Sequence, residues 1–218
     1  MRKPNGCYGP VTCLHIIPLS IKISLQGWGK FQMSNIVGLC GSLRKGSFNR
    51  KLLNEAVRLY GRCDYAEILL DLPLYNGDRE TEQGRPKEVE DLAAAIKSAD
   101  AVIVTSPEYN KGISGVLKNA LDWISRVPGS VWKDKPVTIL SATGGRTGGE
   151  TAQYMLRHCL TPFGVRFLTS PMVCIASASE QFDQNDHLLS DRYISSVEKL
   201  MHNLAQEIEL KQLHPAKE

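Results

Sequence analysis

The chain has 218 residues, of which 42% are hydrophobic and 22% charged, and its formal net charge is +3 at pH 7. This composition predicts a globular protein with a substantial core. The charge is mild and no Lys/Arg run is interleaved with aromatic residues, which argues against nucleic acid as a partner. The six cysteines are scattered, without a C-x-x-C pair or a His at ligand spacing. We therefore expect neither a metal site nor a disulfide framework.

Residues 1–32 lack the alternating strand and helix patterns of the rest of the chain. The stretch 11–25 is moderately apolar, but one His, one Pro and one Lys interrupt it. It is too short and too interrupted to span a membrane, and no small-x-small cleavage site follows it. We expect 1–32 to be an N-terminal extension outside the core, with Met33 as the natural start. Residues 33–218 are then expected to form a single domain, in the cytoplasm.

From residue 35 onward, strand-like and helix-like segments alternate. The predicted strands cover 35–41, 66–71, 101–106, 136–142 and 166–175. The predicted helices cover 48–60, 86–99, 113–125, 149–160 and 189–212, and the Gly-rich, charged stretch 73–85 is expected to be an exposed loop. This α/β alternation predicts a doubly wound parallel sheet with helices on both faces. Ligands of such sheets bind at the carboxyl ends of the strands.

The first loop of this sheet, 41–49, has the features of a phosphate site. It reads Gly-Ser-Leu-Arg-Lys-Gly-Ser-Phe-Asn and opens an amphipathic helix that Ser47 or Asn49 can cap. A helix N-terminus offers unpaired N–H groups and a positive dipole end, and Arg44 adds donors. The loop is neither a Walker sequence nor a three-glycine dinucleotide fingerprint. The alternative is an ordinary polar turn with a capping Ser.

Two further loops follow the third and fourth predicted strands at the same edge. The stretch 106–112 reads Ser-Pro-Glu-Tyr-Asn-Lys-Gly, and 143–149 reads Thr-Gly-Gly-Arg-Thr-Gly-Gly. A Tyr, an Asn and several backbone donors suit a planar heterocycle, and glycines let the backbone approach it closely. The alternative is ordinary turn chemistry, since Gly-Gly often marks only a flexible turn.

Three motifs follow one another along the chain: Gly41-Ser42-Leu43-Arg44 with Ser47 and Asn49, then Pro107-Glu108-Tyr109-Asn110, then Leu117-Lys118-Asn119-Ala120-Leu121-Asp122-Trp123. In this order they resemble the NADPH-dependent FMN reductase family and, within it, the quinone and chromate reductase branch. The resemblance covers residue 35 to the final helix. It implies a flavodoxin-like fold, with five parallel strands in the order 2-1-3-4-5. It also implies a non-covalently held FMN, with NADPH or NADH as cosubstrate.

The resemblance also implies which residues hold the cofactor. They are Ser42, Leu43, Arg44, Ser47, Phe48 and Asn49 in the phosphate loop, Pro107, Glu108, Tyr109 and Asn110 along the isoalloxazine ring, and Thr143 and Gly144 near the ring. Gly112 and Ser114 stand where the commoner family sequence has Ser and Pro. We therefore expect a more mobile loop beside the flavin, which leaves the substrate preference open but does not affect the expectation of FMN binding.

The implied activity is electron transfer from NAD(P)H through FMN to a quinone or another small acceptor, such as chromate, a ferric chelate, an azo dye or free flavin. The flavin supplies the chemistry, so no side chain is nominated as catalytic. Arg146 and Lys111 are candidates to contact the phosphates of NAD(P)H or an anionic acceptor. We interpret His158 as a structural residue of its helix and Glu108 as a solvated loop carboxylate.

Two other functions stay open. One is a flavodoxin-type electron carrier without NAD(P)H turnover, although such carriers usually present acidic faces and this chain is slightly basic. The other is a nucleotide-binding regulatory module. The resemblance implies a homodimer or homotetramer, and Trp123 and Trp132 are candidate interface aromatics beside a Pro-Gly turn. Core packing is the alternative for Trp123.

Overall fold

A computed structural model describes residues 33–213. Five strands form one sheet: β1 (Asn35–Cys40), β2 (Asp64–Ile68), β3 (Ala101–Ser106), β4 (Pro136–Ala142) and β5 (Arg166–Ile175). The helices are α1 (Phe48–Tyr60), α2 (Gly77–Gln83), α3 (Lys87–Ser98), α4 (Gly115–Ile124), α5 (Glu150–Leu160) and α6 (Asp191–Leu213), with short 3-10 turns η1 (Thr161–Phe163) and η2 (Ala178–Glu180). The predicted extension 1–32 lies outside the described residues, and the start at Met33 stays a prediction.

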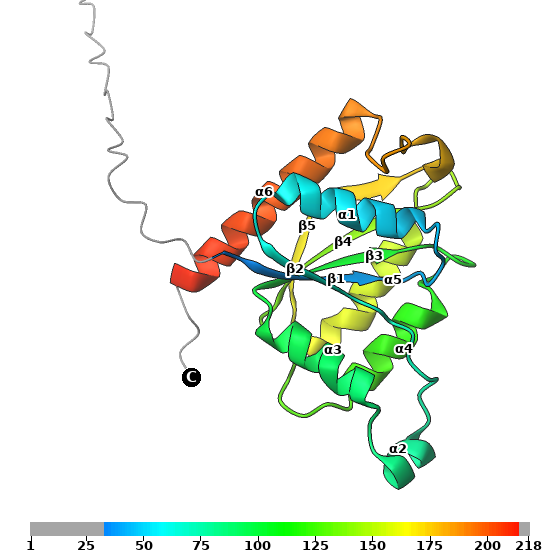
Figure 1. The fold of residues 1–218 in the computed structure, drawn as a ribbon, viewed down its shortest axis with the longest axis vertical. Coiled ribbons are helices and arrows are strands. Elements are labelled where there is room, and N and C mark those ends of the chain that lie inside the picture. Colours follow the sequence, from blue (N-terminus) through cyan, green and yellow to red (C-terminus); the bar gives the residue numbers. More distant parts are fainter. Residues whose placement is uncertain (1–32, 214–218) are drawn as a thin grey trace, which may run out of the picture. The chain divides into compact units, whose positions relative to one another are not determined.

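The sheet has the order β2-β1-β3-β4-β5, and every neighbouring pair is parallel (Figure 1). This confirms the predicted flavodoxin-like order. All residues of β3 and β4 are buried, as expected for central strands covered on both faces. The two edge strands, β2 and β5, contain exposed residues.

Two apolar clusters cover the two faces of the sheet. In β1, Val37 and Leu39 pack with α3, α4 and α5, whereas Ile36 and Cys40 pack with α1 and α6. Successive side chains of a strand point to opposite faces, so a continuous apolar run serves both clusters. The layering brings the loops after β1, β3 and β4 to one edge of the sheet (Figure 1).

The prediction of an uninterrupted loop over 73–85 is wrong, because α2 lies within it. The side chain of Asn76 caps this helix by accepting hydrogen bonds from the N–H groups of Asp78 at 2.9 Å and Arg79 at 3.3 Å. No residue of α2 is buried, so the segment lacks the apolar periodicity that identified the other helices. The next helix begins at Lys87, one residue later than expected, with Pro86 at its N-cap.

The two tryptophans proposed as interface anchors are buried within the chain. Trp123 is 3% exposed and Trp132 is 2% exposed. The indole N–H of Trp123 donates to the carbonyl of Pro73 at 2.7 Å, and the ring meets Tyr75 edge-on at 5.0 Å. Core packing therefore explains Trp123, and neither tryptophan is the exposed aromatic that the interface interpretation required.

Candidate functional site

The loop between β1 and α1 is anchored at both ends. The Ser47 hydroxyl caps α1 by accepting from the N–H of Arg50 at 3.3 Å, and the loop N–H of Gly41 donates to the carbonyl of Thr105 at 2.7 Å. Ser42 and Ser47 are buried, whereas Leu43 and Arg44 between them are exposed. In the predicted phosphate loop, Leu43 and Arg44 are therefore exposed to solvent beside the N-terminus of α1, while Ser42 and Ser47 are buried.

Arg50 orients this loop, and sequence reasoning missed it. Its guanidinium donates to the carbonyls of Ser42 at 3.3 Å and Arg44 at 3.2 Å, while its Nε donates to Glu67 at 2.7 Å. The bond to Glu67 raises the pKa of Arg50, which keeps the guanidinium charged. In a trans peptide the carbonyl and the next N–H point in opposite directions. The N–H groups of Leu43 and Lys45 therefore point away from Arg50, as an anion-binding turn requires.

Asn49, another predicted phosphate residue, binds the backbone of β4 through both the nitrogen and the oxygen of its side-chain amide. Its Nδ2 donates to the carbonyl of Ala142 at 2.8 Å, and its Oδ1 accepts from the N–H of Ala142 at 3.0 Å. These two residues are 93 positions apart, and both are buried. Asn49 thus fastens the first turn of α1 to the carboxyl end of β4 with both ends of its amide.

The loop after β3 is a tight hairpin turn. Tyr109 and Gly112 exchange two backbone hydrogen bonds of 3.0 Å, and the residues between them, Asn110 and Lys111, have φ values of 50° and 65°. Two successive positive φ values are those of a type I′ turn. A Cβ at Gly112 would lie 2.9 Å from the sulfur of Met155, so a larger residue here would have to displace that flexible side chain of α5. The greater mobility expected of the loop stays a prediction.

A buried serine joins this turn to the phosphate loop. The hydroxyl of Ser114 donates to the carbonyl of Gly41 at 2.6 Å and accepts from the N–H of Leu117 at 3.2 Å, which caps α4. Pro107 is buried beside it, whereas Tyr109 is 53% exposed and faces outward. Ser114 was identified as a departure from the family sequence but not as a link, although its place before an apolar helix is a capping signal.

Glu108 connects the loop after β3 to α5. Its Oε2 accepts from the N–H of Ala152 in the first turn of α5 at 3.1 Å, and its Oε1 lies 3.7 Å from the Lys111 ammonium. The side chain is only 11% exposed. The interpretation of Glu108 as a solvated carboxylate is therefore wrong: it neutralises the positive end of a helix dipole and fixes the distance between two loops.

The loop after β4 carries the predicted ring contacts Thr143 and Gly144. The N–H of Thr143 donates to the carbonyl of Ile175 at 3.0 Å, and Gly144 is exposed with open space around its Cα. At the other end of the loop Gly149 has a φ of 92°, and a Cβ there would lie 2.8 Å from that of Ser141. The flexible-turn alternative is excluded at Gly149, since its positive φ and the close approach of the Ser141 side chain require a glycine here.

Arg146 of the same loop lines a pocket of about 390 Å³ with Glu150, Cys174 and Arg192, among others. Arg192 comes from α6, and nothing in the local sequence pointed to it. Two guanidinium groups around one pocket suit an anionic ligand. Burial raises the pKa of the Cys174 thiol, so this cysteine stays neutral beside them.

His158 lies apart from these loops. It is exposed near the end of α5, about 12 Å along the helix from its first residue. It therefore neither packs in the core nor reaches the loop edge. Within residues 33–213, no group of three or more His, Cys, Asp or Glu side chains could hold a metal ion, and no helix is long and apolar enough to cross a membrane.

Comparison with known proteins agrees with this site. The family model of NADPH-dependent FMN reductase matches residues 34–180. An NAD(P)H-dependent FMN reductase of Pseudomonas aeruginosa is 42% identical over 159 residues, which cover 72% of this chain and 85% of that protein. The NAD(P)H:quinone oxidoreductase of Solanum tuberosum is 40% identical over 164 residues, which cover 72% of this chain and 82% of that protein.

A solved structure is similar over nearly its whole length. The flavoenzyme NAD(P)H:(acceptor) oxidoreductase FerB of Paracoccus denitrificans superposes with a TM-score of 0.74 at 29% identity, covering 82% of this chain and 98% of that one. The match of the family model spans the three loops at the carboxyl edge of the sheet. The chain belongs to the NADPH-dependent FMN reductase family.

Proposed function

We propose that this protein is an FMN-dependent oxidoreductase that takes electrons from NAD(P)H and delivers them to a quinone or another small acceptor. The observation that carries this function is the convergence of three loops, after β1, β3 and β4, beside the N-terminus of α1. Relatives named as NAD(P)H-dependent FMN reductase and quinone reductase support the same reaction. The electron-carrier alternative is not favoured, because these relatives are reductases.

The phosphate loop fits the phosphate of FMN through its donor set. The outward N–H groups of Leu43 and Lys45, the Ser42 hydroxyl and the Arg44 guanidinium supply hydrogen bonds and charge. The first-turn N–H groups of Phe48 and Asn49 add the positive end of α1. The hydroxyl of Ser47 and the amide of Asn49 act by holding this turn in place rather than by direct contact.

FMN held by these loops would supply the redox chemistry between the nicotinamide and the acceptor. The chain orients and shields the site. Pro107, Tyr109 and Asn110 would border the ring from one side, and Thr143 with Gly144 from another. Glu108 is a positioning residue, because its carboxylate is bonded to the N–H of Ala152.

Arg146 is proposed to attract the phosphates of NAD(P)H or an anionic acceptor such as chromate. It is exposed on the ring-side loop and shares its pocket with Arg192. Arg146→Ala should raise the KM for NADPH about tenfold, as expected for the loss of a charged hydrogen bond, with little change in kcat. Arg166→Ala, which removes an exposed ion pair with Glu207 at the amino end of β5, is the matched control. An unchanged KM in Arg146→Ala would remove this residue from the proposal.

The first experiment is a visible spectrum of the purified protein, followed without oxygen while NADPH and then a quinone are added. A flavin spectrum that bleaches with NADPH and recovers with quinone is the expected result. Flavin that NAD(P)H does not bleach would instead favour the carrier function. Failure of the protein to bind added FMN would contradict the assignment of residues 42–49.

The cellular location and the oligomeric state are part of the proposal. We place the protein in the cytoplasm, as a homodimer or homotetramer. The four cysteines within the described part of the chain are free, as is usual in reducing compartments. Light scattering coupled to size-exclusion chromatography tests the oligomeric state, and a clean monomer would contradict it.

A further inference from the structure

The pocket of about 390 Å³ that contains Arg146 is built from three segments that are distant in the sequence. Arg146 comes from the loop after β4, Cys174 from the end of β5 and Arg192 from the first turn of α6. Gly144, predicted to lie beside the flavin ring, is two residues before Arg146, so their Cα atoms are at most about 7 Å apart. A dinucleotide whose nicotinamide lies at the ring can therefore extend its other half toward this pocket.

The backbone around the pocket is preformed. Gly148 has a φ of 62°, and a Cβ there would lie 2.5 Å from the carbonyl carbon of Cys174, so the loop after β4 packs directly on β5. The hydroxyl of Tyr193 accepts from the N–H of Ala176 at 3.2 Å, which joins the first turn of α6 to the end of the same strand. The two arginines are thus carried by segments held against β5, which lowers the cost of binding a ligand between them.

The two guanidinium groups have no partner within residues 33–213. Arg146 and Arg192 are both exposed, and their side chains form neither a hydrogen bond nor an ion pair in this part of the chain. By contrast, the guanidinium groups of Arg50, Arg85 and Arg166 are each paired with a glutamate. A planar guanidinium matches the oxygens of a phosphate with two parallel hydrogen bonds. The pocket therefore offers two such groups to one anion.

One carboxylate also lines the pocket. Glu150 is the first residue of α5, is exposed, and forms no ion pair with either arginine of the pocket. Two guanidinium groups and one carboxylate leave a net positive charge, which favours an anionic ligand. A phosphate monoester carries a charge of about −1.5 to −2 at pH 7 and has three acceptor oxygens, whereas each phosphate of a pyrophosphate bridge carries a single charge. The monoester is therefore the better partner for both arginines.

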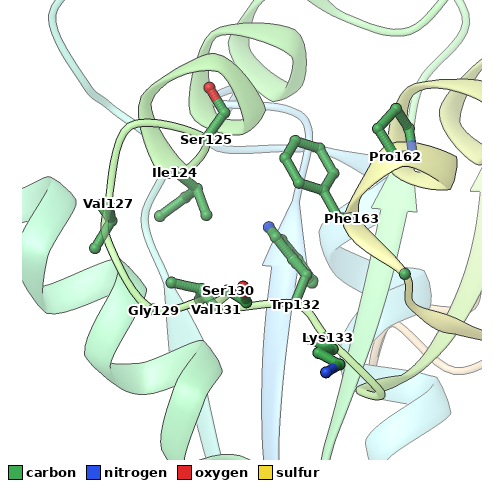
Figure 2. A pocket seen from close by; sticks show the side chains of 11 residues that line it. Ile124, Ser125, Val127, Gly129, Ser130, Val131, Trp132, Lys133, Pro162 and Phe163 are labelled. Atoms are coloured by element: carbon green, nitrogen blue, oxygen red, sulfur yellow. The ribbon is translucent and has the colours of Figure 1, made fainter.

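A second cavity shows that this concentration of charge is not a general property of the pockets. Figure 2 shows Ile124, Trp132 and Phe163 around a space of about 550 Å³, and Lys133 is the one charged residue that lines it. It lies beside the segments that lead into β4 and β5, at the amino ends of these strands. Lys133 therefore provides an exposed cation remote from the Arg146 pocket, which serves below as a control.

We propose that Arg146 and Arg192 bind the 2′-phosphate of NADPH, and that the protein therefore prefers NADPH to NADH. This inference rests on the proposed reductase function and names its electron donor. The two nucleotides share the nicotinamide and the pyrophosphate, and only NADPH has a phosphate monoester. Arg192, from the last helix, is thus a specificity-determining residue.

The first test is equilibrium dialysis of the FMN-loaded protein with NADP⁺ and NAD⁺, which differ only in the 2′-phosphate. The wild type should bind NADP⁺ about tenfold more tightly, as expected for charge-assisted hydrogen bonds. Arg192→Ala should reduce this preference to about twofold or less, and Lys133→Ala should preserve it. Glu150→Gln removes the opposing charge of the pocket and should increase the preference.

Steady-state kinetics provides a second measurement. Arg192→Ala should raise the KM for NADPH about tenfold and leave both kcat and the KM for NADH unchanged. The inference would be overturned by equal affinities of the wild type for NADP⁺ and NAD⁺, by the absence of NADP⁺ binding at about 1 mM, or by a preference that persists in Arg192→Ala. A variant that impairs only chromate reduction would assign the pocket to an anionic acceptor and equally overturn it.

Failure of the reductase function itself has a different signature. In that case neither NADPH nor NADH bleaches the bound flavin. The dialysis measures binding without turnover, so it still decides whether the two arginines select the 2′-phosphate.

Discussion

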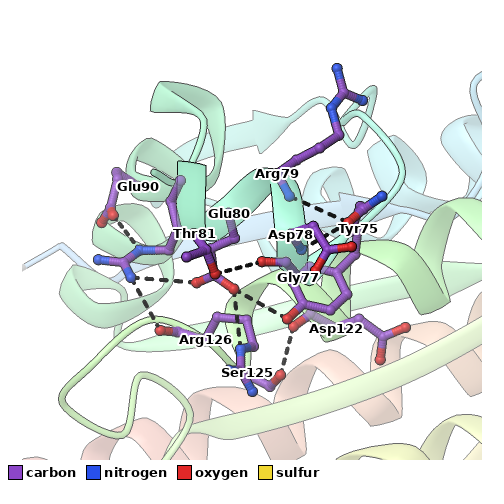
Figure 3. A network of polar contacts seen from close by, with 12 residues as sticks. Tyr75, Gly77, Asp78, Arg79, Glu80, Thr81, Glu90, Asp122, Ser125 and Arg126 are labelled. Carbon is purple, nitrogen blue, oxygen red and sulfur yellow. Dashed lines mark hydrogen bonds and ion pairs between the residues drawn. The ribbon is translucent and has the colours of Figure 1, made fainter. Parts of the chain in front are cut away.

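The cofactor edge and the α2 arm, residues 71–86, are both held to the body of the protein by polar contacts, but of different kinds. At the cofactor edge, buried side chains bond to distant backbone: Asn49 to Ala142, and Ser114 to Gly41. The stem of the arm is held in the same way, by Trp123 and Asn119 of α4, but at its tip Glu80 joins Arg85 and Arg126 at the surface (Figure 3). Buried bonds to backbone define one geometry, whereas surface ion pairs are screened and contribute little. The protein therefore fixes the loops that carry its chemistry more firmly than the tip of its arm.

The largest effect should come from breaking the link between α1 and β4. Asn49→Ala leaves the N–H and the carbonyl of Ala142 buried without partners, so we expect a loss of about 2–4 kcal/mol of unfolding free energy. Denaturant unfolding measures it. Asn76→Ala, which removes the exposed cap of α2, is the control and should cost about 1 kcal/mol. Equal losses in both variants would contradict the difference between the two regions.

A second prediction concerns Glu55, a buried residue in the middle of α1. Its buried carboxylate accepts from Arg58 at 2.7 Å, His187 at 3.1 Å and the N–H of Leu188 at 3.2 Å, which ties α1 to the loop before α6. Burial alone would raise the pKa of Glu55, but these hydrogen bonds outweigh it and the pKa lies below its ordinary value of 4.5. A lowered folded-state pKa stabilises the protein above pH 4.5 and ceases to do so as the pH falls through the folded value.

Glu55→Gln should accordingly lower the unfolding free energy at pH 7 by about 1.5–3 kcal/mol. The loss should shrink as the pH falls below 4.5, where the wild-type carboxylate also becomes neutral. Unfolding curves at several pH values measure this difference. Glu88→Gln, at an exposed position of α3, serves as the control and should show no such convergence. A difference that stays constant at low pH would contradict the assignment.

The stem of the arm should respond less than the cofactor edge. Asn119 of α4 accepts from the N–H of Tyr75 at 2.9 Å and donates to the carbonyl of Pro73 at 3.0 Å. Asn119→Ala frees backbone groups near the surface that can turn to water, so we expect a loss of about 1–2 kcal/mol. Limited proteolysis should then cut within 71–86 faster than in the wild type. Unchanged cutting would show that Trp123 alone holds the stem.

The smallest effect is expected at the tip of the arm. Glu80→Gln removes the ion pairs to Arg85 and Arg126 while keeping an acceptor for the Tyr75 hydroxyl, and should cost less than about 1 kcal/mol. Thermal unfolding at low salt and at about 1 M salt measures it, because screening removes such pairs. The two proteins should become indistinguishable at high salt. A difference that survives would mean that this network behaves like the buried contacts.

Local patterns predicted most of the fold. The periodicity of apolar residues placed the five strands and the long helices, and Ser47 was recognised as a cap because capping depends only on neighbouring residues. The helix α2 was missed because it buries nothing and therefore has no apolar pattern. The sequence also marked the three loops that form the candidate site.

The contacts within the site could not be predicted. Asn49 and Ala142 are 93 residues apart, and nothing near either residue indicates the other. Arg192 reaches the pocket of Arg146 from α6 for the same reason. The burial of Trp132 was not foreseen either, since a tryptophan beside Pro-Gly turns reads equally well as a surface residue. Long-range geometry, rather than residue type, decides these roles.

The close contact between Gly149 and Ser141 limits which substitutions the loop after β4 can accept. Any side chain at position 149 would collide with Ser141 in the strand below, whereas Gly144, five residues earlier in the same loop, has open space around it. In a randomised library the first position should tolerate almost no replacement and the second should tolerate most. Changes that alter ligand contacts are therefore expected at Gly144, whereas functional variants should keep glycine at position 149.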